Sequence, residues 1–217
     1  MREDSAFMKQ YLLLFCLFLG LAFTHSDEKE RLTKRYVDQY ASIAVMEMHR
    51  SGIPASIILA QGIHESNSGT SALATRANNH FGIKCKAYWR GDTYYHEDDD
   101  YDDKGRLLES CFRSYEDPND SYLDHTDFLM HTPYYQKLFH LPRTDYQSWA
   151  RGLKHCGYAT DPKYAQKLIG LVEKFGLNKF DLLRASEIEK TGTVLETNND
   201  EVLVLPDNYR RSRYMDN

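Results

Sequence analysis

Residues 54–66 read PASIILAQGIHES, and this stretch carries both the clearest structural pattern and the candidate chemistry of the chain. Pro54 suits the start of a helix, and the apolar residues after it occupy most faces, which predicts a largely buried helix. A single carboxylate, Glu65, stands at its C-terminal end. Burial and the negative end of the helix dipole both disfavour ionisation of Glu65. A carboxyl that stays protonated near neutral pH suits general acid cleavage of a glycosidic bond, whereas a glutamate that simply reaches solvent would have no such role.

Apolar spacing and end signals predict further helices around this one. An amphipathic helix is expected over residues 33–49, with Gly52 as its C-terminal stop, and a short helix from near Ser71 to before Asn78. Three more are expected, from Asn119 or Asp120 through Met130, from Asp145 to before Gly157, and from Asp161-Pro162 to before Gly176.

One β-hairpin interrupts the helices. Residues 91–101 and 106–113 read as strands on either side of an Asp-Asp-Lys-Gly turn. Cys85 and Cys111 flank this hairpin, so its strands could bring their Cβ atoms within bridging distance. We expect a disulfide between them, which leaves Cys156 as the one free thiol after residue 26. The alternative is that all three of these cysteines are buried thiols. The fold class is therefore mainly α, with a small β-hairpin lobe.

Composition limits the number of domains and the kinds of partner. The chain has 217 residues, of which 41% are hydrophobic, enough for one compact core but thin for two full domains. Its formal charge of -5 is mild, and the lysines and arginines are scattered along the sequence. Without a basic stripe, nucleic acid is not an expected partner.

The two ends of the chain read differently from its middle. Lys9 precedes an apolar run, residues 11–23, that is too short to span a bilayer comfortably, so residues 1–26 are expected to be a signal peptide cleaved near Ser26. Export implies an oxidising compartment. After Asp181 the sequence becomes polar and loses its period, which is typical of a disordered tail over 182–217. This leaves residues 27–181 as the folded domain.

Two metal patterns are incomplete. Asp98, Asp100, Asp102 and Glu109 have the spacing of an EF-hand calcium loop, but Asp103 stands where that loop needs glycine. His64-Glu65 starts a zinc-protease pattern, yet residue 68 is serine where a second histidine is required. We therefore expect neither a metal nor another cofactor.

Several motifs along residues 33–180 resemble one known family. They are Ile53-Pro54-Ala55-Ser56, Leu59-Ala60-Gln61 through Glu65-Ser66, Asn78-Asn79-His80-Phe81-Gly82-Ile83-Lys84, Phe112-Arg113-Ser114-Tyr115, and Gly157-Tyr158-Ala159-Thr160-Asp161-Pro162-Lys163-Tyr164-Ala165. In this order they resemble the glucosaminidases of glycoside hydrolase family 73, which include flagellar muralytic enzymes and many autolysins. The resemblance implies a lysozyme-like α+β fold.

The resemblance also implies roles for individual residues. Glu65 matches the family's catalytic acid, and a second carboxylate is expected on the hairpin. Counting from Trp89 favours Asp100, while counting back from Phe112 points nearer Asp99; Glu97, Asp98, Asp102 and Asp103 are the other carboxylates of this stretch. Tyr158 matches a tyrosine near the acid and is expected to assist it, whereas Tyr164 is expected in the core. The residues expected to line a glycan groove are Asn79, Phe81, Trp89 and Tyr115.

The function implied is cleavage of the β-1,4 bond that follows N-acetylglucosamine in peptidoglycan, by an exported monomeric endo-β-N-acetylglucosaminidase of the periplasm or cell envelope. Whether the reaction inverts or retains configuration stays open. The alternatives are a muramidase or lytic transglycosylase on the same fold, and a catalytically inactive module that binds the wall or serves assembly.

Overall fold

The computed structural model describes the backbone of residues 3–184, 194–196 and 202–204, and the side chains of residues 27–98 and 101–184. The chain divides into two units, Met1–Arg35 and Tyr36–Asn217. Helix α1 (Glu3–Ser51) makes up the described part of the first unit and continues into the second. The expected start of this helix near Thr33 is therefore wrong, because no proline interrupts residues 3–51. Its expected stop is confirmed, since Gly52 has a positive φ of 86°.

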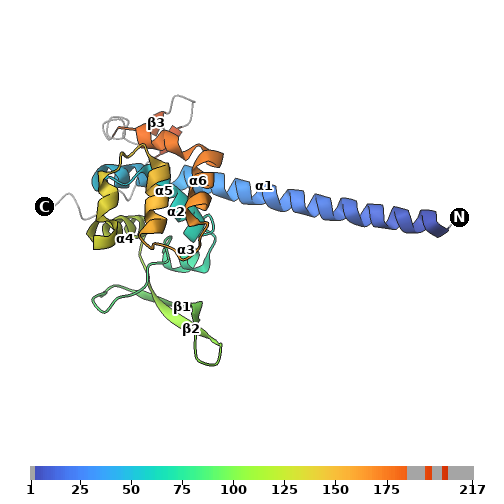
Figure 1. Cartoon of the computed structure of the whole chain (residues 1–217), viewed down its shortest axis with the longest axis horizontal. Coiled ribbons are helices and arrows are strands. Elements are labelled where there is room, and N and C mark those ends of the chain that lie inside the picture. The colour runs from blue at the N-terminus through green and yellow to red at the C-terminus, as the bar shows by residue number, and fades with distance from the viewer. Residues whose placement is uncertain (1–2, 185–193, 197–201, 205–217) are drawn as a thin grey trace. The chain divides into compact units, whose positions relative to one another are not determined.

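The second unit is mainly helical with one hairpin, which confirms the expected fold class. Figure 1 labels its α-helices and the strands β1 to β3. Besides the end of α1, the elements of this unit are α2 (Ala55–Glu65), α3 (Ala72–Ala77), β1 (Thr93–Tyr101), β2 (Leu107–Arg113), α4 (Pro118–His131), η1 (Pro133–His140), α5 (Tyr146–His155), α6 (Tyr164–Phe175), η2 (Leu177–Leu182), β3 (Val194–Glu196) and β4 (Val202–Val204). The two 3₁₀ helices η1 and η2 were not expected from the sequence.

Helix α2 forms the centre of the core, as its apolar sequence predicts. Every residue from Ala55 to Ile63 is buried, and α2 packs against α5, α6 and η2. Gly62 allows Tyr36 to approach closely, because a Cβ at this position would lie 2.5 Å from the Tyr36 hydroxyl oxygen. The buried side chain of Asp181 in η2 holds the N-terminus of α2 by accepting hydrogen bonds from the amide (2.8 Å) and hydroxyl (2.6 Å) of Ser56. Glu65 is thus presented at the far end of a fixed helix.

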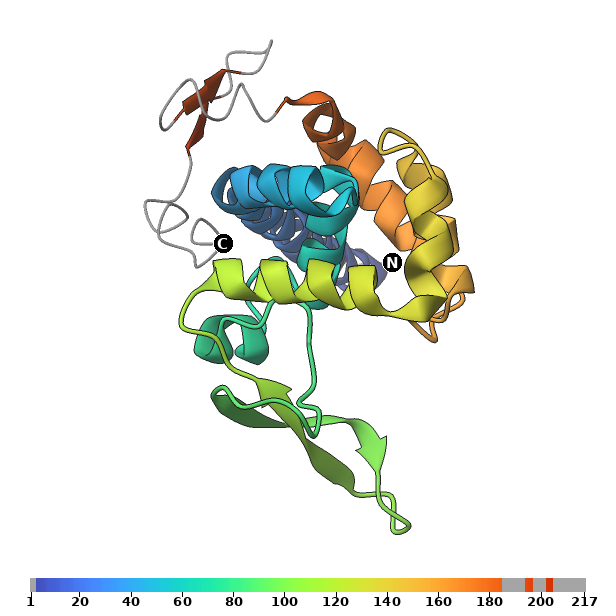
Figure 2. The same cartoon turned by 90° about the vertical axis from the view of Figure 1, so that its left-hand side faces the viewer.

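The hairpin forms a separate lobe. Figure 2 shows α4 lying between this hairpin and α2, whereas α3 lies on the hairpin side of α4. The strands pair antiparallel from Thr93↔Arg113 to Glu97↔Glu109, and again at Tyr101↔Leu107. Residues 98–100 therefore bulge opposite the single residue Leu108. Cys85 and Cys111 are joined by a disulfide, and their Cα atoms are 5.4 Å apart, so the expected pairing is confirmed; Cys156 is a free thiol.

Two predicted helix starts are wrong. Helix α4 is capped by Asp117, which accepts a hydrogen bond from the Asn119 amide, and not by Asn119 or Asp120, because Pro118 already takes the first helical position. Helix α6 begins at Tyr164 and not at Asp161-Pro162, since the Asp161 carboxylate accepts from the Lys163 amide in a turn before the helix. Asp145 caps α5 as expected, and Gly176 ends α6 with a φ of 61°.

The C-terminal segment lies largely outside the described residues, so the expected disorder over 182–217 stays a prediction. Within it, β3 and β4 pair antiparallel, with Val194 opposite Val204. Over the parts of the chain that the structure describes, none of the helices combines the length and apolar content needed to cross a membrane.

Candidate active site

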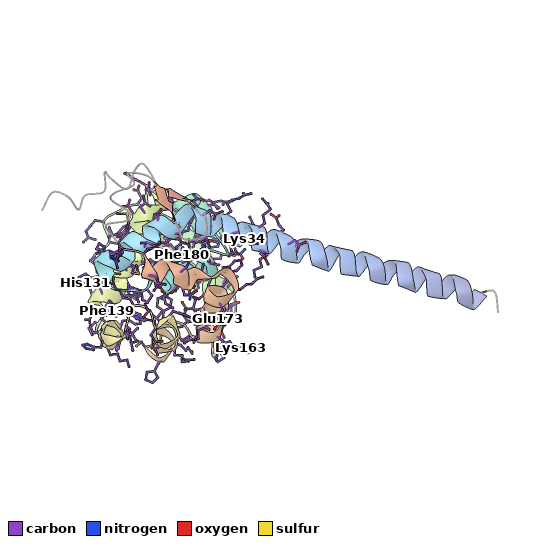
Figure 3. The ribbon with its side chains drawn as sticks, turned by 90° about the horizontal axis from the view of Figure 1, so that it is seen from above. Lys34, His131, Phe139, Lys163, Glu173 and Phe180 are labelled. Carbon is purple, nitrogen blue, oxygen red and sulfur yellow. A yellow bond between two sulfur atoms is a disulfide. The ribbon has the colours of Figure 1, made fainter. Side chains whose placement is uncertain are left out.

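A cleft of about 880 Å³ runs along the second unit beside Glu65. It is lined by the end of α2, the segment between α3 and β1, parts of both hairpin strands, α4 with the start of η1, and residues 158–164. His131, labelled in Figure 3, lines it from the C-terminal end of α4. Its walls thus come from the helical body and from the hairpin lobe.

Glu65 is the last residue of α2 and lies half-buried in this cleft. Burial raises the pKa of the Glu65 carboxyl, while a hydrogen bond from Tyr164 and the charge of Lys167 act in the opposite direction. The C-terminus of α2, the negative end of its helix dipole, also lies at this position and disfavours a negative charge there. The expected position of Glu65 at the end of a buried helix is confirmed, and its role as the proton donor stays a prediction.

Tyr164 is the nearest polar partner of Glu65. Its hydroxyl donates to Oε1 of Glu65 at 2.9 Å and accepts from the Gln61 side-chain amide at 3.1 Å. Tyr164 is only 1% exposed, so the expectation of a core position is confirmed. Its contact with Glu65 was not among the sequence predictions.

Tyr158 lines the cleft beside this pair. Its ring stacks on that of Tyr164 with centroids 5.5 Å apart and an interplanar angle of 26°. Burial and the nearby Glu65 raise the pKa of the Tyr158 hydroxyl well above its ordinary range. Tyr158 is therefore present as a neutral hydroxyl near Glu65, where the sequence placed it.

The other described carboxylates of the cleft are each paired with a base. Their salt bridges are Asp98–Lys84 (2.5 Å), Asp124–Arg113 (2.6 Å), Asp127–Arg50 (2.7 Å) and Asp161–Lys167 (2.6 Å). Glu65 makes no such bridge within the described part of the chain. Glu65 therefore differs from these four carboxylates in having no salt bridge there, and burial raises the pKa of its carboxyl group.

The carboxylates of the hairpin lie in different surroundings. Asp98 lines the cleft, Glu97 is exposed outside its lining, and Asp102 binds the Arg106 side chain and the amides of the turn. The side chains of Asp99 and Asp100 lie outside the described residues, so the choice of Asp100 stays a prediction. The described side chains contain no group of three or more His, Cys, Asp or Glu that could hold a metal ion.

The four predicted groove residues fall into two groups. Phe81 lines the cleft and stacks on the His125 ring, with centroids 3.9 Å apart. Asn79 is buried behind it, where its amide bonds the carbonyls of Ile83 and Arg113 and so fixes the segment that carries Phe81.

Trp89 and Tyr115 pack around the Arg113–Asp124 pair and are not part of the cleft lining. The Trp89 ring lies 4.5 Å from the Arg113 guanidinium, and the Tyr115 hydroxyl donates to Asp124 at 2.5 Å. Two other aromatic residues, Tyr88 and Phe128, line the cleft and are 70% and 40% exposed. Tyr88 and Phe128 were not predicted from the sequence, because the exposure of an aromatic ring in a cleft depends on the fold.

A helical body, a hairpin lobe and a half-buried glutamate in the cleft between them define a lysozyme-like domain. The chain belongs to the glucosaminidase family, whose model, described as mannosyl-glycoprotein endo-beta-N-acetylglucosaminidase, matches residues 41–177. The expected family is therefore confirmed.

Named relatives agree with this assignment. The chain is 32% identical over 167 residues to the exo-glucosaminidase LytG of Bacillus subtilis, covering 74% of this chain and 58% of LytG. It is 30% identical to the peptidoglycan hydrolase FlgJ of Vibrio parahaemolyticus, covering 70% and 50%. The solved glycoside hydrolase domain of Salmonella typhimurium FlgJ shares 25% identity with a TM-score of 0.56, covering 74% and 94%. The chain thus spans about half the length of these two curated relatives.

Proposed function

We propose that the protein hydrolyses peptidoglycan glycan strands at the β-1,4 bond that follows N-acetylglucosamine, acting as an endo-β-N-acetylglucosaminidase. The observation that carries this proposal is the state of Glu65: half-buried at a helix C-terminus, without a salt bridge to any described residue, in a cleft of about 880 Å³. Family membership and relatives named as peptidoglycan hydrolases support the substrate class.

In this proposal Glu65 donates its proton to the leaving glycosidic oxygen. The hydrogen bond from Tyr164 fixes the orientation of the carboxyl group and supports the carboxylate that remains after proton transfer. Tyr158 assists from the adjacent position by hydrogen bonding to substrate or by stabilising charge. Because all of these groups belong to the protein, the reaction needs no metal or other cofactor.

The second carboxylate comes from the hairpin, and we propose Asp100. Two points support this segment: residues 98–100 bulge out of the ladder, and Asp98 at its start lines the cleft. Asp98 itself is held by Lys84, which makes it the weaker candidate for activating water. Asp100 would activate water or stabilise the positive charge that develops on the sugar.

Substrate contact is assigned to the residues that reach the cleft. Phe81 offers an apolar surface there, and we extend this role to Tyr88 and Phe128. Asn79, Trp89 and Tyr115 act through their contacts, because they hold the Phe81 segment and the Arg113–Asp124 pair in place.

Export to the cell envelope completes the proposal. A leader over residues 1–26 and the Cys85–Cys111 disulfide both fit an oxidising extracytoplasmic compartment, where the wall is found. We propose that the mature domain acts there as a monomer.

Analysis of digestion products tests the bond that is cut. Purified protein is incubated with cell-wall sacculi, and the soluble products are reduced with borohydride and separated for mass spectrometry. The proposal expects N-acetylglucosamine at the new reducing ends, in fragments of varied length. Reducing N-acetylmuramic acid would identify a muramidase, an anhydro sugar a lytic transglycosylase, and release of small units from strand ends alone an exo-enzyme like the relative LytG. No soluble product would leave the inactive wall-binding module.

A further inference from the structure

Lys86 is a cation of the cleft without a counterion among the described side chains. The two other lysine and arginine side chains of the lining are neutralised there, Lys84 by Asp98 and Arg113 by Asp124. Lys86 lines the same cleft, and its side chain is exposed. The two salt bridges of this wall, Lys84–Asp98 and Arg113–Asp124, contribute no net charge, so Lys86 adds one positive charge to its described side chains.

The backbone around Lys86 is fixed, so its position is defined by the fold. Cys85, directly before it, is tied to Cys111 by the disulfide and by a backbone hydrogen bond of 2.8 Å. The Lys86 carbonyl accepts from the Trp89 amide at 2.9 Å, and the Trp89 ring packs on Arg113. Because the backbone is held on both sides of Lys86, placing its ammonium group in the cleft costs little backbone entropy.

The sugars of the proposed substrate are largely uncharged, so an unpaired ammonium group has little to recognise on the ring atoms alone. Every second sugar of peptidoglycan is N-acetylmuramic acid, which differs from N-acetylglucosamine by a lactyl ether. The lactyl carboxyl group is either free or amide-linked to a stem peptide that carries carboxylates of its own. Carboxylates are therefore the anions that this strand brings into a cleft.

We propose that Lys86 binds a carboxylate on the lactyl substituent of the glycan strand, and so selects muramyl-containing strands over uncharged N-acetylglucosamine polymers. This inference rests on the proposed function and names the feature of the substrate that the hairpin side of the cleft recognises. The carboxylate belongs either to the free lactyl group or to the stem peptide, and the test separates these two sources.

Binding to three probes tests the proposal. The probes are soluble glycan strands with stem peptides, the same strands after amidase treatment has exposed the lactyl carboxylates, and an uncharged N-acetylglucosamine oligomer. The full chain carrying Glu65→Gln is compared with Glu65→Gln/Lys86→Ala and with Glu65→Gln/Lys104→Ala. Lys104 is the matched control, because it is an exposed lysine of the hairpin turn outside the cleft lining.

Loss of Lys86 is expected to weaken binding of at least one charged probe by up to about fivefold, the upper end for an exposed ion pair, and to leave the uncharged oligomer unaffected. The loss shrinks as ionic strength rises. A loss limited to peptide-bearing strands assigns the stem peptide, and a loss limited to amidase-treated strands assigns the lactyl carboxylate. Equal losses on all three probes, or none on any, overturn the proposal. If the parent chain without these substitutions releases no product from sacculi, the proposed function itself fails, which is a separate result.

Discussion

Replacing Tyr164 with phenylalanine removes one hydroxyl group and keeps the ring that fills the core. In the structure this hydroxyl donates to Glu65 at 2.9 Å, and its hydrogen bond lowers the pKa of the Glu65 carboxyl against the larger effect of burial. Tyr164→Phe therefore leaves burial in place and removes the larger of the two opposing contributions, the other being the charge of Lys167. The pKa of Glu65 is expected to rise further.

The size of the effect follows from the kind of hydrogen bond that is lost. A hydrogen bond to a charged group contributes about 1.5 kcal/mol at the low end, which disfavours the ionised carboxylate about tenfold once the bond is gone. A general acid works only while protonated, so activity falls as pH rises through its pKa. The alkaline limb of kcat/KM should move to higher pH. At a pH on that limb, kcat/KM divided by its own maximal value should be up to about tenfold larger for the variant than for the parent protein.

The assay is kcat/KM on soluble glycan strands across pH, with Tyr158→Phe as the matched variant. Tyr158 is also a cleft tyrosine, but no hydrogen bond joins it to Glu65 in the described part of the chain, so its variant should change the rate without moving the limb. The maximal rate of Tyr164→Phe should fall because Glu65 loses its orienting partner. An alkaline limb that stays in place or moves to lower pH would refute the reasoning.

Three further results are expected. In protein lacking residues 1–26, thiol titration under denaturing, non-reducing conditions should find the single thiol of Cys156, and Cys85→Ser/Cys111→Ser should lower the free energy of unfolding by about 3 kcal/mol; three titratable thiols would exclude the bridge. Burial raises the pKa of Asp181 from 3.8 to about 6, so the protein binds a proton on folding and its stability should fall as pH rises between these values, by up to about 3 kcal/mol. Denaturant titration should show this slope in the parent protein and not in Asp181→Asn, and an unchanged slope in the variant would assign it elsewhere. Activity should survive prolonged chelation; a loss that calcium restores would revive the Asp98 to Glu109 loop as an ion site.

Local patterns in the sequence predicted most of the fold. The apolar run of α2, the glycine stops after α1 and α6 and the alternating hairpin are each encoded within a few residues. Caps were harder where signals compete: residues 117–120 read Asp-Pro-Asn-Asp, three of which can cap a helix, and the proline decides in favour of Asp117.

The site was predictable only where one segment contains the signal. Glu65 was found because α2 carries both the carboxyl and the apolar surroundings. Its partner Tyr164 is 99 residues away and has the spacing of a core residue, so nothing near it in the sequence points to Glu65. Most of the salt bridges in the cleft also join residues from different segments, as Lys84 and Asp98 do, so the basic partner of a cleft carboxylate follows from the fold.

The hairpin partner is tested by ranking single variants. Asp100→Asn should slow hydrolysis more than Asp99→Asn or Glu97→Gln, because Asp100 is proposed to activate water or stabilise charge while Glu97 is exposed outside the cleft lining. Initial rates on sacculi measure the order. A silent Asp100→Asn beside an inactive Glu97→Gln would leave Glu65 as the acid and show that the hairpin carboxylate was assigned to the wrong residue.

The most direct test of the account is the rate at which Glu65→Gln releases soluble products from sacculi, measured beside the exposed control Glu173→Gln on α6, labelled in Figure 3. Glutamine has the shape of glutamic acid but no proton to donate. General acid catalysis contributes about 10²–10⁴-fold, so Glu65→Gln should lose at least about 10²-fold in turnover while wall binding and thermal stability persist, and Glu173→Gln should match the parent protein. Near-parental turnover in a folded, wall-binding Glu65→Gln protein would contradict the role of Glu65 as the acid.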